Sequence, residues 1–308
     1  IKKNKIKSEL IDDVNILENS LKLDLYSSDF SINIETTAYE DLDKSKSDRY
    51  EFILPKINLV KKIDNKTSLK GNFLFKSNNL VRNYNTNIFE KTNVNDLIFT
   101  SYPIITGMGF YNNYEFIIKN SNSNGKKSEN FKNGENLYVS SLLQLNSSLP
   151  LIKENRSYKD IFKPKLSFKI APSHTKDYSN DESVFDVNNI FSLDRINKND
   201  TVEGGISLAY GTDYLIVDKN DNRELLSLKF ANNLRLKEND DLSHSYQIGK
   251  KTSNFFTEAK YNPNEFFNIK YNSSIKNNFS DISNESLVAE FNIMGLTSSF
   301  SYLNENNT

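Results

Sequence analysis

Apolar and polar residues alternate in short runs along most of this 308-residue chain. In the run from Phe266 to Lys276, Phe267, Ile269 and Tyr271 fall on one side of an extended strand, with asparagines and lysines on the other. A dozen or more such runs follow one another, many of them close to the roughly 9 to 11 residues that a tilted strand needs to cross a bilayer. The pattern predicts an all-β chain of antiparallel strands.

The stretch from Phe162 to Tyr214 places two such strands around a long polar connection. We expect the strands at Phe162–Ile170 and Thr201–Tyr210, joined by a loop at 172–200. The first strand carries two distinct faces, an apolar one with Leu166, Phe168 and Ile170 and a polar one with Lys163, Lys165, Ser167 and Lys169. The central question is therefore which of the two faces is turned outward.

The composition agrees with strands that have one polar face. Hydrophobic residues make up only 37% of the chain and the mean hydropathy is -0.61, values that by themselves suggest disorder. However, 16 tyrosines and 21 phenylalanines are too many for a disordered chain. The absence of cysteine excludes disulfides within the chain, and the net charge of -1 gives no reason to expect a nucleic-acid-binding surface.

Two architectures share this alternation, a soluble sandwich or solenoid with a dry core and an outer-membrane barrel with a wet or plugged lumen. No run approaches the roughly 18 apolar residues of a membrane helix, so a membrane-spanning form would cross with strands. Aromatic residues recur near the expected strand ends, as they do in the interfacial girdles of barrels, although tyrosine and phenylalanine are also good strand formers. The pattern favours the barrel.

Residues arranged for catalysis or metal binding are sparse. The chain has two histidines, His174 and His244, and neither a Gly-x-Ser-x-Gly nor a His-Glu-x-x-His motif. The segment from Asp218 begins like a calcium loop, but Arg223 stands where a glycine is needed and Lys229 where a glutamate is needed. We therefore expect a hairpin turn there, and a chain that is not an enzyme and has no cofactor.

Short motifs in a fixed order resemble the LptD family of outer-membrane proteins, which assemble lipopolysaccharide. The sequence Phe191-Ser192-Leu193-Asp194-Arg195 is followed by Val202-Glu203-Gly204-Gly205 and then by Tyr210-Gly211. The earlier positions that are similar to the family are Arg49, Tyr50, Pro55, Asn95, Asp96 and Pro164. Each motif is short, and the resemblance depends on their order and spacing.

This resemblance implies a large antiparallel transmembrane β-barrel with a polar lumen and long extracellular loops, located in the bacterial outer membrane. Members receive lipopolysaccharide from a periplasmic bridge protein, hold a plug lipoprotein of the LptE type, and release the lipid sideways into the outer-membrane lipid. Residues 1–308 would form part of one barrel domain, with the periplasmic N-terminal domain and the closing strands outside them. A general porin or another outer-membrane transport barrel remains the alternative.

The resemblance and the alternation together suggest site residues. Five polar side chains would suit a lumen that carries a sugar-phosphate head group, although any barrel would present similar ones: Lys70, Lys165, Lys169, Asn268 and Lys270. Asp194, Arg195 and Glu203 could form a charged cluster that folds the long loop over or into the barrel, with Gly204 and Gly205 allowing close backbone approach. An exposed loop base with solvated charges is the alternative.

Four local expectations concern the asparagine-rich segments, the N-terminus and Pro55. Asn78 and Asn79 have the chemistry of a turn, and 120–136 reads as a long loop. The spacing of apolar residues in the first 20 positions fits a helix or a frayed strand. Pro55 indicates a strand end, an edge or a bulge.

Overall fold

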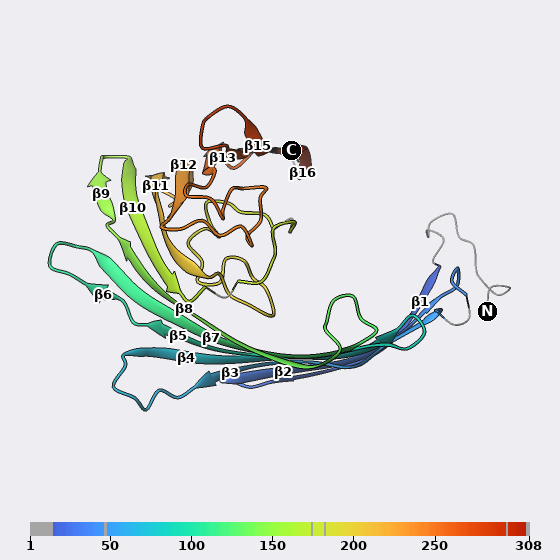
Figure 1. Ribbon diagram of the computed structural model, residues 1–308. Coiled ribbons are helices and arrows are strands. Elements are labelled where there is room, and N and C mark those ends of the chain that lie inside the picture. The colour runs from blue at the N-terminus through green and yellow to red at the C-terminus, as the bar shows by residue number, and fades with distance from the viewer. Residues whose placement is uncertain (1–14, 46–47, 174, 182, 294, 306–308) are drawn as a thin grey trace. The chain divides into compact units, whose positions relative to one another are not determined.

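A computed structural model describes residues 15–45, 48–173, 175–181, 183–293 and 295–305 of the chain. Every long regular element in these residues is a β-strand (Figure 1). None of the described residues belongs to a helix with the length and hydropathy that a membrane crossing requires. The strands are β1 (Ile16–Tyr26), β2 (Phe30–Asp41), β3 (Tyr50–Ile63), β4 (Gly71–Tyr84), β5 (Ile88–Ser101), β6 (Ile104–Ile105), β7 (Tyr111–Lys126), β8 (Gly134–Ser148), β9 (Leu151–Glu154), β10 (Tyr158–Ala171), β11 (Gly205–Asp218), β12 (Glu224–Arg235), β13 (Phe255–Asn264), β14 (Phe267–Ile275), β15 (Ile282–Ile293) and β16 (Leu296–Glu305).

The strands form one antiparallel sheet in which each main strand pairs with the next along the chain. Short β6 and β9 pair only with β7 and β10, and the remaining strands follow in order from β1 to β16. Within the described residues β1 and β16 are the two ends of this order, so the sheet is not closed. The all-β prediction is confirmed, and the sandwich alternative, which requires two stacked sheets, is wrong.

The chain divides into two compact units, which are described separately below. The first contains the described residues up to Phe99, together with Ile118–Ser140 and Asn199–Thr201. The second contains Thr100–Ile117, Ser141–Lys198 and the described residues from Val202 onward. The long connection after β10 belongs almost entirely to the second unit.

Strand β10 shows that the apolar face is open and the polar face is covered. Leu166 is 50% exposed and Ile170 is 41% exposed, whereas Ser167 is fully buried and Lys169 is only 2% exposed. Soluble proteins place their apolar residues inside and leave lysine at the surface. The burial of alternate residues in β10 is therefore the reverse of the pattern in a soluble sheet.

Two long connections cover the polar face of the second unit. The segments 172–204 and 236–254 lie beside β11, β12 and β13 (Figure 1). They contribute buried apolar side chains that pack together against these strands. The strands contribute mostly small residues to this core, with Ala209 and Ala231 almost fully buried under the segments. Small side chains on the polar face therefore make room for the two segments to pack closely.

Several local expectations about strand ends and turns are wrong. The second strand of the central stretch begins at Gly205 rather than at Thr201, so Val202 lies before the strand, where it is buried. Asn78 and Asn79 lie in the middle of β4, and the expected loop at 120–136 shrinks to 127–133 because β7 continues to Lys126. In both places hydrogen bonds with Asn93 of β5, accepted by Asn79 and donated by Asn122, override the turn preference of asparagine.

Other expectations hold. Pro55 lies in β3 where the register shifts against β4 between Ile53 and Lys56, as at a bulge. Asp218 to Arg223 forms the turn between β11 and β12, as expected for the segment that resembles a calcium loop. Residues 1–14, which carry most of the helix-or-strand expectation, lie outside the described residues, and β1 begins at Ile16.

Candidate functional site

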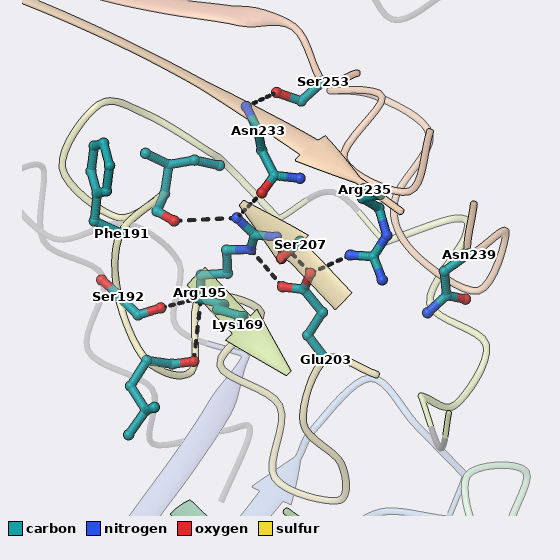
Figure 2. A network of polar contacts seen from close by, with 12 residues as sticks. Lys169, Phe191, Ser192, Arg195, Glu203, Ser207, Asn233, Arg235, Asn239 and Ser253 are labelled. Carbon is teal, nitrogen blue, oxygen red and sulfur yellow. Dashed lines mark hydrogen bonds and ion pairs between the residues drawn. The ribbon is translucent and has the colours of Figure 1, made fainter. Parts of the chain in front are cut away.

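A network of buried polar side chains holds segment 172–204 to the polar face of the sheet (Figure 2). We call it the loop anchor, and its members are Lys169, Arg195, Glu203, Ser207, Asn233 and Arg235. Strand register brings the strand residues together, because Lys169 lies opposite Ser207 and Ser207 lies opposite Arg235. Three strands that are separated in the sequence thus present one row of polar groups to the loop.

Arg195 is the centre of the loop anchor. Its Nε and Nη2 donate to the two carboxylate oxygens of Glu203, each at 2.5 Å. Its Nη1 donates to Asn233 Oδ1 at 2.9 Å and to the carbonyl of Ile190 at 3.3 Å, and Nη2 also reaches Ser207 Oγ at 3.2 Å. The side chain is completely buried. A planar guanidinium suits this role because it offers five donors in a fixed geometry.

Glu203 is shared between two arginines. Arg235 also forms an ion pair with Glu203 and donates to the carbonyl of Gly204. Burial by itself would raise the pKa of Glu203, but the charges of Arg195 and Arg235 and the hydrogen bond from Arg195 hold that pKa well below its usual range. The carboxylate is therefore ionised at neutral pH and compensates two buried cations.

The side chain of Lys169 binds the backbone of the loop. The Lys169 Nζ donates to the carbonyl of Ser192 and, at 3.3 Å, to the carbonyl of Leu193. From β8, Gln144 Nε2 donates to the carbonyl of Phe191 at 2.8 Å. These carbonyls lie in consecutive residues, so two strands together fix the backbone of one turn of the loop.

Phe191 packs into a space that Gly211 leaves free. A Cβ atom added to Gly211 would lie 2.2 Å from the carbonyl oxygen of Phe230 and 3.0 Å from Phe191 Cζ. From the neighbouring strand, Lys165, which lies opposite Gly211, places its Nζ 4.6 Å from the centroid of the Phe191 ring, as in a cation–π contact. The aromatic ring of the loop and the missing side chain of the strand are therefore complementary.

Gly205 meets a similar constraint at the start of β11. Its φ is +92°, a left-handed conformation that favours glycine, and an added Cβ would lie 2.8 Å from Arg235 Nη2. The residue therefore turns the chain from Glu203 into the strand while leaving room for the Arg235 guanidinium.

A second row of charges crosses the polar face farther along the strands. Lys165 Nζ lies 2.7 Å from the carboxylate of Asp213, and Lys229 Nζ lies 2.7 Å from that of Glu258. Lys270 Nζ contacts the other oxygen of Glu258 at 3.0 Å. These five residues, which we call the charge row, come from β10 to β14 and carry charges of both signs.

The first unit has its own buried carboxylate on the polar face. Glu90 Oε1 accepts hydrogen bonds from Tyr84, Ser128 and Asn130 at 2.9, 2.6 and 3.0 Å. Ser128 and Asn130 belong to the short connection between β7 and β8, and Glu90 is 3% exposed. A strand carboxylate thus fixes this second connection.

The chain matches the family model of LptD, LPS transport system D, over residues 2–308. It belongs to the LptD family. A search among curated proteins finds no match to the chain. The members of this family are outer-membrane proteins that transport and assemble lipopolysaccharide, and they are not enzymes. The all-β sheet agrees with an outer-membrane protein.

The structure brings together most of the family motifs in the second unit. Phe191, Arg195, Glu203, Gly205 and Gly211 all contact the loop anchor or one another, and Gly204 contributes its carbonyl to Arg235. Asp194 is half-buried beside Arg195 in the loop. Tyr210 lies on the opposite face of β11, with its ring 6.3 Å from that of Phe230. Pro164, in β10, lies opposite Thr212 of β11. It is at the level of the turn between β8 and β9.

The motif residues of the first unit are spread out. Arg49 pairs with Glu40 at 2.8 Å, and Tyr50 stacks on Phe52 at the start of β3. Asp96 lies 3.9 Å from Lys119. Asn95, on the opposite face of β5, bonds to Ser77 and to other asparagines.

The five residues expected on the polar face differ in position. Lys165 and Lys270 belong to the charge row and Lys169 to the loop anchor. Asn268 donates to Glu290 Oε2 at 2.6 Å, and Lys70 is exposed just before β4. Reasoning from the sequence did not single out Ser207, Asn233 or Arg235, although polar residues at alternate positions of β12 carry the necessary signal.

The described residues contain no group of three or more histidine, cysteine, aspartate or glutamate side chains that could hold a metal ion. The site is therefore a set of ion pairs and hydrogen bonds that holds loops to a sheet. Its chemistry is that of positioning and polar contact.

Proposed function

We propose that this chain forms part of an outer-membrane barrel that inserts lipopolysaccharide into the outer leaflet through a polar lumen and a lateral opening. The observation that carries the proposal is the reversed burial of β10, in which apolar side chains are exposed and Lys169 and Ser167 are covered. A strand in a membrane barrel has lipid on its apolar face and a polar interior on the other.

The charge row supports passage of a polar head group. Lipopolysaccharide carries sugars and phosphates, which need hydrogen-bonding partners and positive charge when they leave bulk water. Lys229 and Lys270 flank Glu258 on the polar face, and Lys165 pairs with Asp213 nearby. Paired charges of this kind can exchange partners with a passing head group without leaving an isolated charge.

The loop anchor supports a barrel with a blocked interior rather than an open channel. Segment 172–204 is tied to β10, β11 and β12 at the end of these strands where β10 ends and β11 begins. A segment fixed in this way restricts flow of water and ions along the polar face. This favours a lipid translocon over the porin alternative, for which an open channel is expected.

The proposal includes the partners that the family resemblance implies. A plug lipoprotein of the LptE type would contact the polar interior, and a periplasmic bridge protein would deliver the lipid. The apolar face would contact outer-membrane lipid, with the protein located in the bacterial outer membrane. The chain would then be one part of a single barrel domain.

The test uses the full-length protein with its plug lipoprotein, reconstituted in vesicles and supplied with lipopolysaccharide by the bridge protein. We expect delivery of lipopolysaccharide to the outer leaflet, low ionic conductance, and a clear loss of delivery when Lys229 and Lys270 are both changed to Gln. The matched control is Lys250→Gln, which removes an exposed lysine paired with Asp240 at 2.8 Å. High conductance without lipid delivery would replace the proposal with the porin alternative.

A further inference from the structure

The first unit carries a group of polar residues on the face that holds apolar side chains such as Ile57 and Leu59 of β3. We call it the asparagine island, and it comes from three neighbouring strands. Its members are Ser77 and Asn79 in β4, Asn93 and Asn95 in β5, and Asn120 and Asn122 in β7. Asn95 and Asn120 are adjacent in sequence to Asp96 and Lys119, which pair on the polar face. Successive side chains in a strand alternate between faces, so the island lies on the opposite one.

The island is held together by side-chain hydrogen bonds. Asn93 Oδ1 accepts from Asn95 Nδ2 at 2.6 Å and from Asn122 Nδ2 at 3.2 Å, and Asn93 in turn donates to Asn79. Asn122 Nδ2 also reaches Asn120 Oδ1 at 2.7 Å. The carboxamides are therefore fixed in one arrangement before any ligand arrives.

Apolar residues flank the island on both sides at the same height. In β3, Ile57 and Leu59 lie directly opposite Asn79 and Ser77. Toward β8, Asn120 Nδ2 approaches the carbonyl of Tyr138 at 3.5 Å, and the next residue, Val139, is 61% exposed. The island is thus bordered by apolar side chains in β3 and β8, while β5 and β7 carry further polar residues beyond it, among them Lys91 and Asn124.

Such a patch is costly against hydrocarbon. Each carboxamide has two donors and a carbonyl with two lone pairs, and the bonds within the island use only some of them. An unsatisfied polar group in an apolar medium costs several kcal/mol. Contact with acyl chains alone would therefore be unfavourable, and a polar occupant would remove the penalty.

A cavity beside the island has the size of a ligand site. Its volume is about 470 Å³, and it is lined by Asn93, Asn122, Asn124, Ser123, Lys91 and Glu135 among others. Binding sites for small molecules commonly occupy roughly 300–1,000 Å³. One lysine and one glutamate balance in charge, and the uncharged polar groups of the lining are carboxamides and the Ser123 hydroxyl, beside the apolar side chain of Leu137.

We propose that the asparagine island and its cavity bind the sugar head group of a glycolipid in the surrounding leaflet. Carboxamides offer a donor and an acceptor side by side, which matches neighbouring hydroxyl groups of a sugar. The balanced charge of Lys91 and Glu135 favours hydroxyl groups over phosphate as the recognised chemistry. This inference rests on the proposed function, because it requires the apolar face to lie in lipid.

The test measures binding of three lipids to the full-length complex in mild detergent: rough lipopolysaccharide, the same lipid without phosphates, and phosphatidylethanolamine. The double variant Asn93→Leu with Asn122→Leu removes two carboxamides and keeps the branched shape and the number of heavy atoms of each side chain. We expect about fourfold to hundredfold weaker binding of both glycolipids, since each of the two lost hydrogen bonds contributes roughly twofold to tenfold. Binding of phosphatidylethanolamine should not change.

The matched control is Asn33→Leu with Asn58→Leu, a pair of bonded asparagines in β2 and β3 on the face that carries Glu35 and Lys56. It should bind all three lipids like the wild type. Heat-modifiability gels check that both double variants fold. Equal glycolipid binding by folded wild type and island variant would overturn the proposal. The proposal would also be overturned if wild type and island variant differed in binding the phosphorylated lipid but not the lipid without phosphates.

A photo-crosslinking amino acid at position 139 separates this inference from the proposed function. Crosslinking to lipid from Val139 in native membranes, together with unchanged glycolipid binding by the island variant, would reject the sugar site alone. Absence of any lipid crosslink would reject the placement of the apolar face in lipid, and with it the proposed function.

Discussion

Arg195 and Lys198 allow a direct comparison of a buried and a partly exposed cation in one loop. Arg195 is completely buried and bonds to Glu203, Asn233 and Ser207. Lys198 pairs with Asp181 at 2.7 Å, and both of these side chains keep about a quarter of their surface exposed. We expect Arg195→Ala to reduce the folded yield of the barrel much more than Lys198→Ala.

The magnitudes follow from burial. Removing one partner of a buried ion pair costs about 3–5 kcal/mol, because the other charge loses its compensation. In Arg195→Ala, Arg235 still contacts Glu203, so the lower end of this range applies. The loss of the hydrogen bond to Asn233 Oδ1 adds to this cost. An exposed pair contributes only about 0–1 kcal/mol. The difference of about 2–3 kcal/mol is a large fraction of the stability of a typical protein.

The assay compares wild type and both variants of the full-length protein. Heat-modifiability gels give the folded fraction after assembly, and denaturant titration of the folded material gives the free energy of unfolding. Arg195→Ala should show a low folded fraction and an earlier midpoint, and Lys198→Ala should resemble the wild type. Equal folded fractions and midpoints for the two variants would refute the role of the loop anchor.

Two further predictions concern the same region. Gly211→Ala should lower the folded yield because its Cβ would meet the Phe230 carbonyl at 2.2 Å, whereas Gly107→Ala, with no atom within 4 Å, should not; a normal yield for Gly211→Ala would contradict the packing of Phe191. The folded-state pKa of Glu203 is depressed, so its contribution to stability is present above its unfolded pKa of about 4.3 and is lost as pH falls through the folded value. Unfolding titrations between neutral and acidic pH should therefore show a steeper loss of stability for wild type than for Glu203→Gln, and parallel curves would exclude this contribution.

Much of the fold is predictable from local pattern. The alternation in Phe162–Ile170 and Phe266–Lys276 places these runs in β10 and β14, and Pro55 marks an irregularity in β3. Alternation is readable because side chains in a strand point to opposite faces whatever the strand pairs with. It fails at Asn79 and Asn122, where asparagines that favour turns in isolation are held in strands by Asn93 of the neighbouring strand β5.

The site is only partly predictable. The motifs around Arg195 and Glu203 suggested a charged cluster, and both residues are close enough in sequence for a local pairing to be foreseen. Asn233 and Arg235 could not be assigned to it, because they come from a strand about 40 residues away in sequence. The space at Gly211 for Phe191 is likewise a consequence of how the loop returns to the sheet.

The sequence by itself determined that the chain forms strands with one apolar and one polar face, since that information lies in neighbouring residues. Only the tertiary structure decided that the polar face is the covered one. Burial of Lys169 and Arg195 requires partners from other strands and from the loop backbone, and those partners meet only through strand register. The physical reason is that a buried charge is tolerated where several distant groups converge on it, and convergence is a property of the fold rather than of any segment.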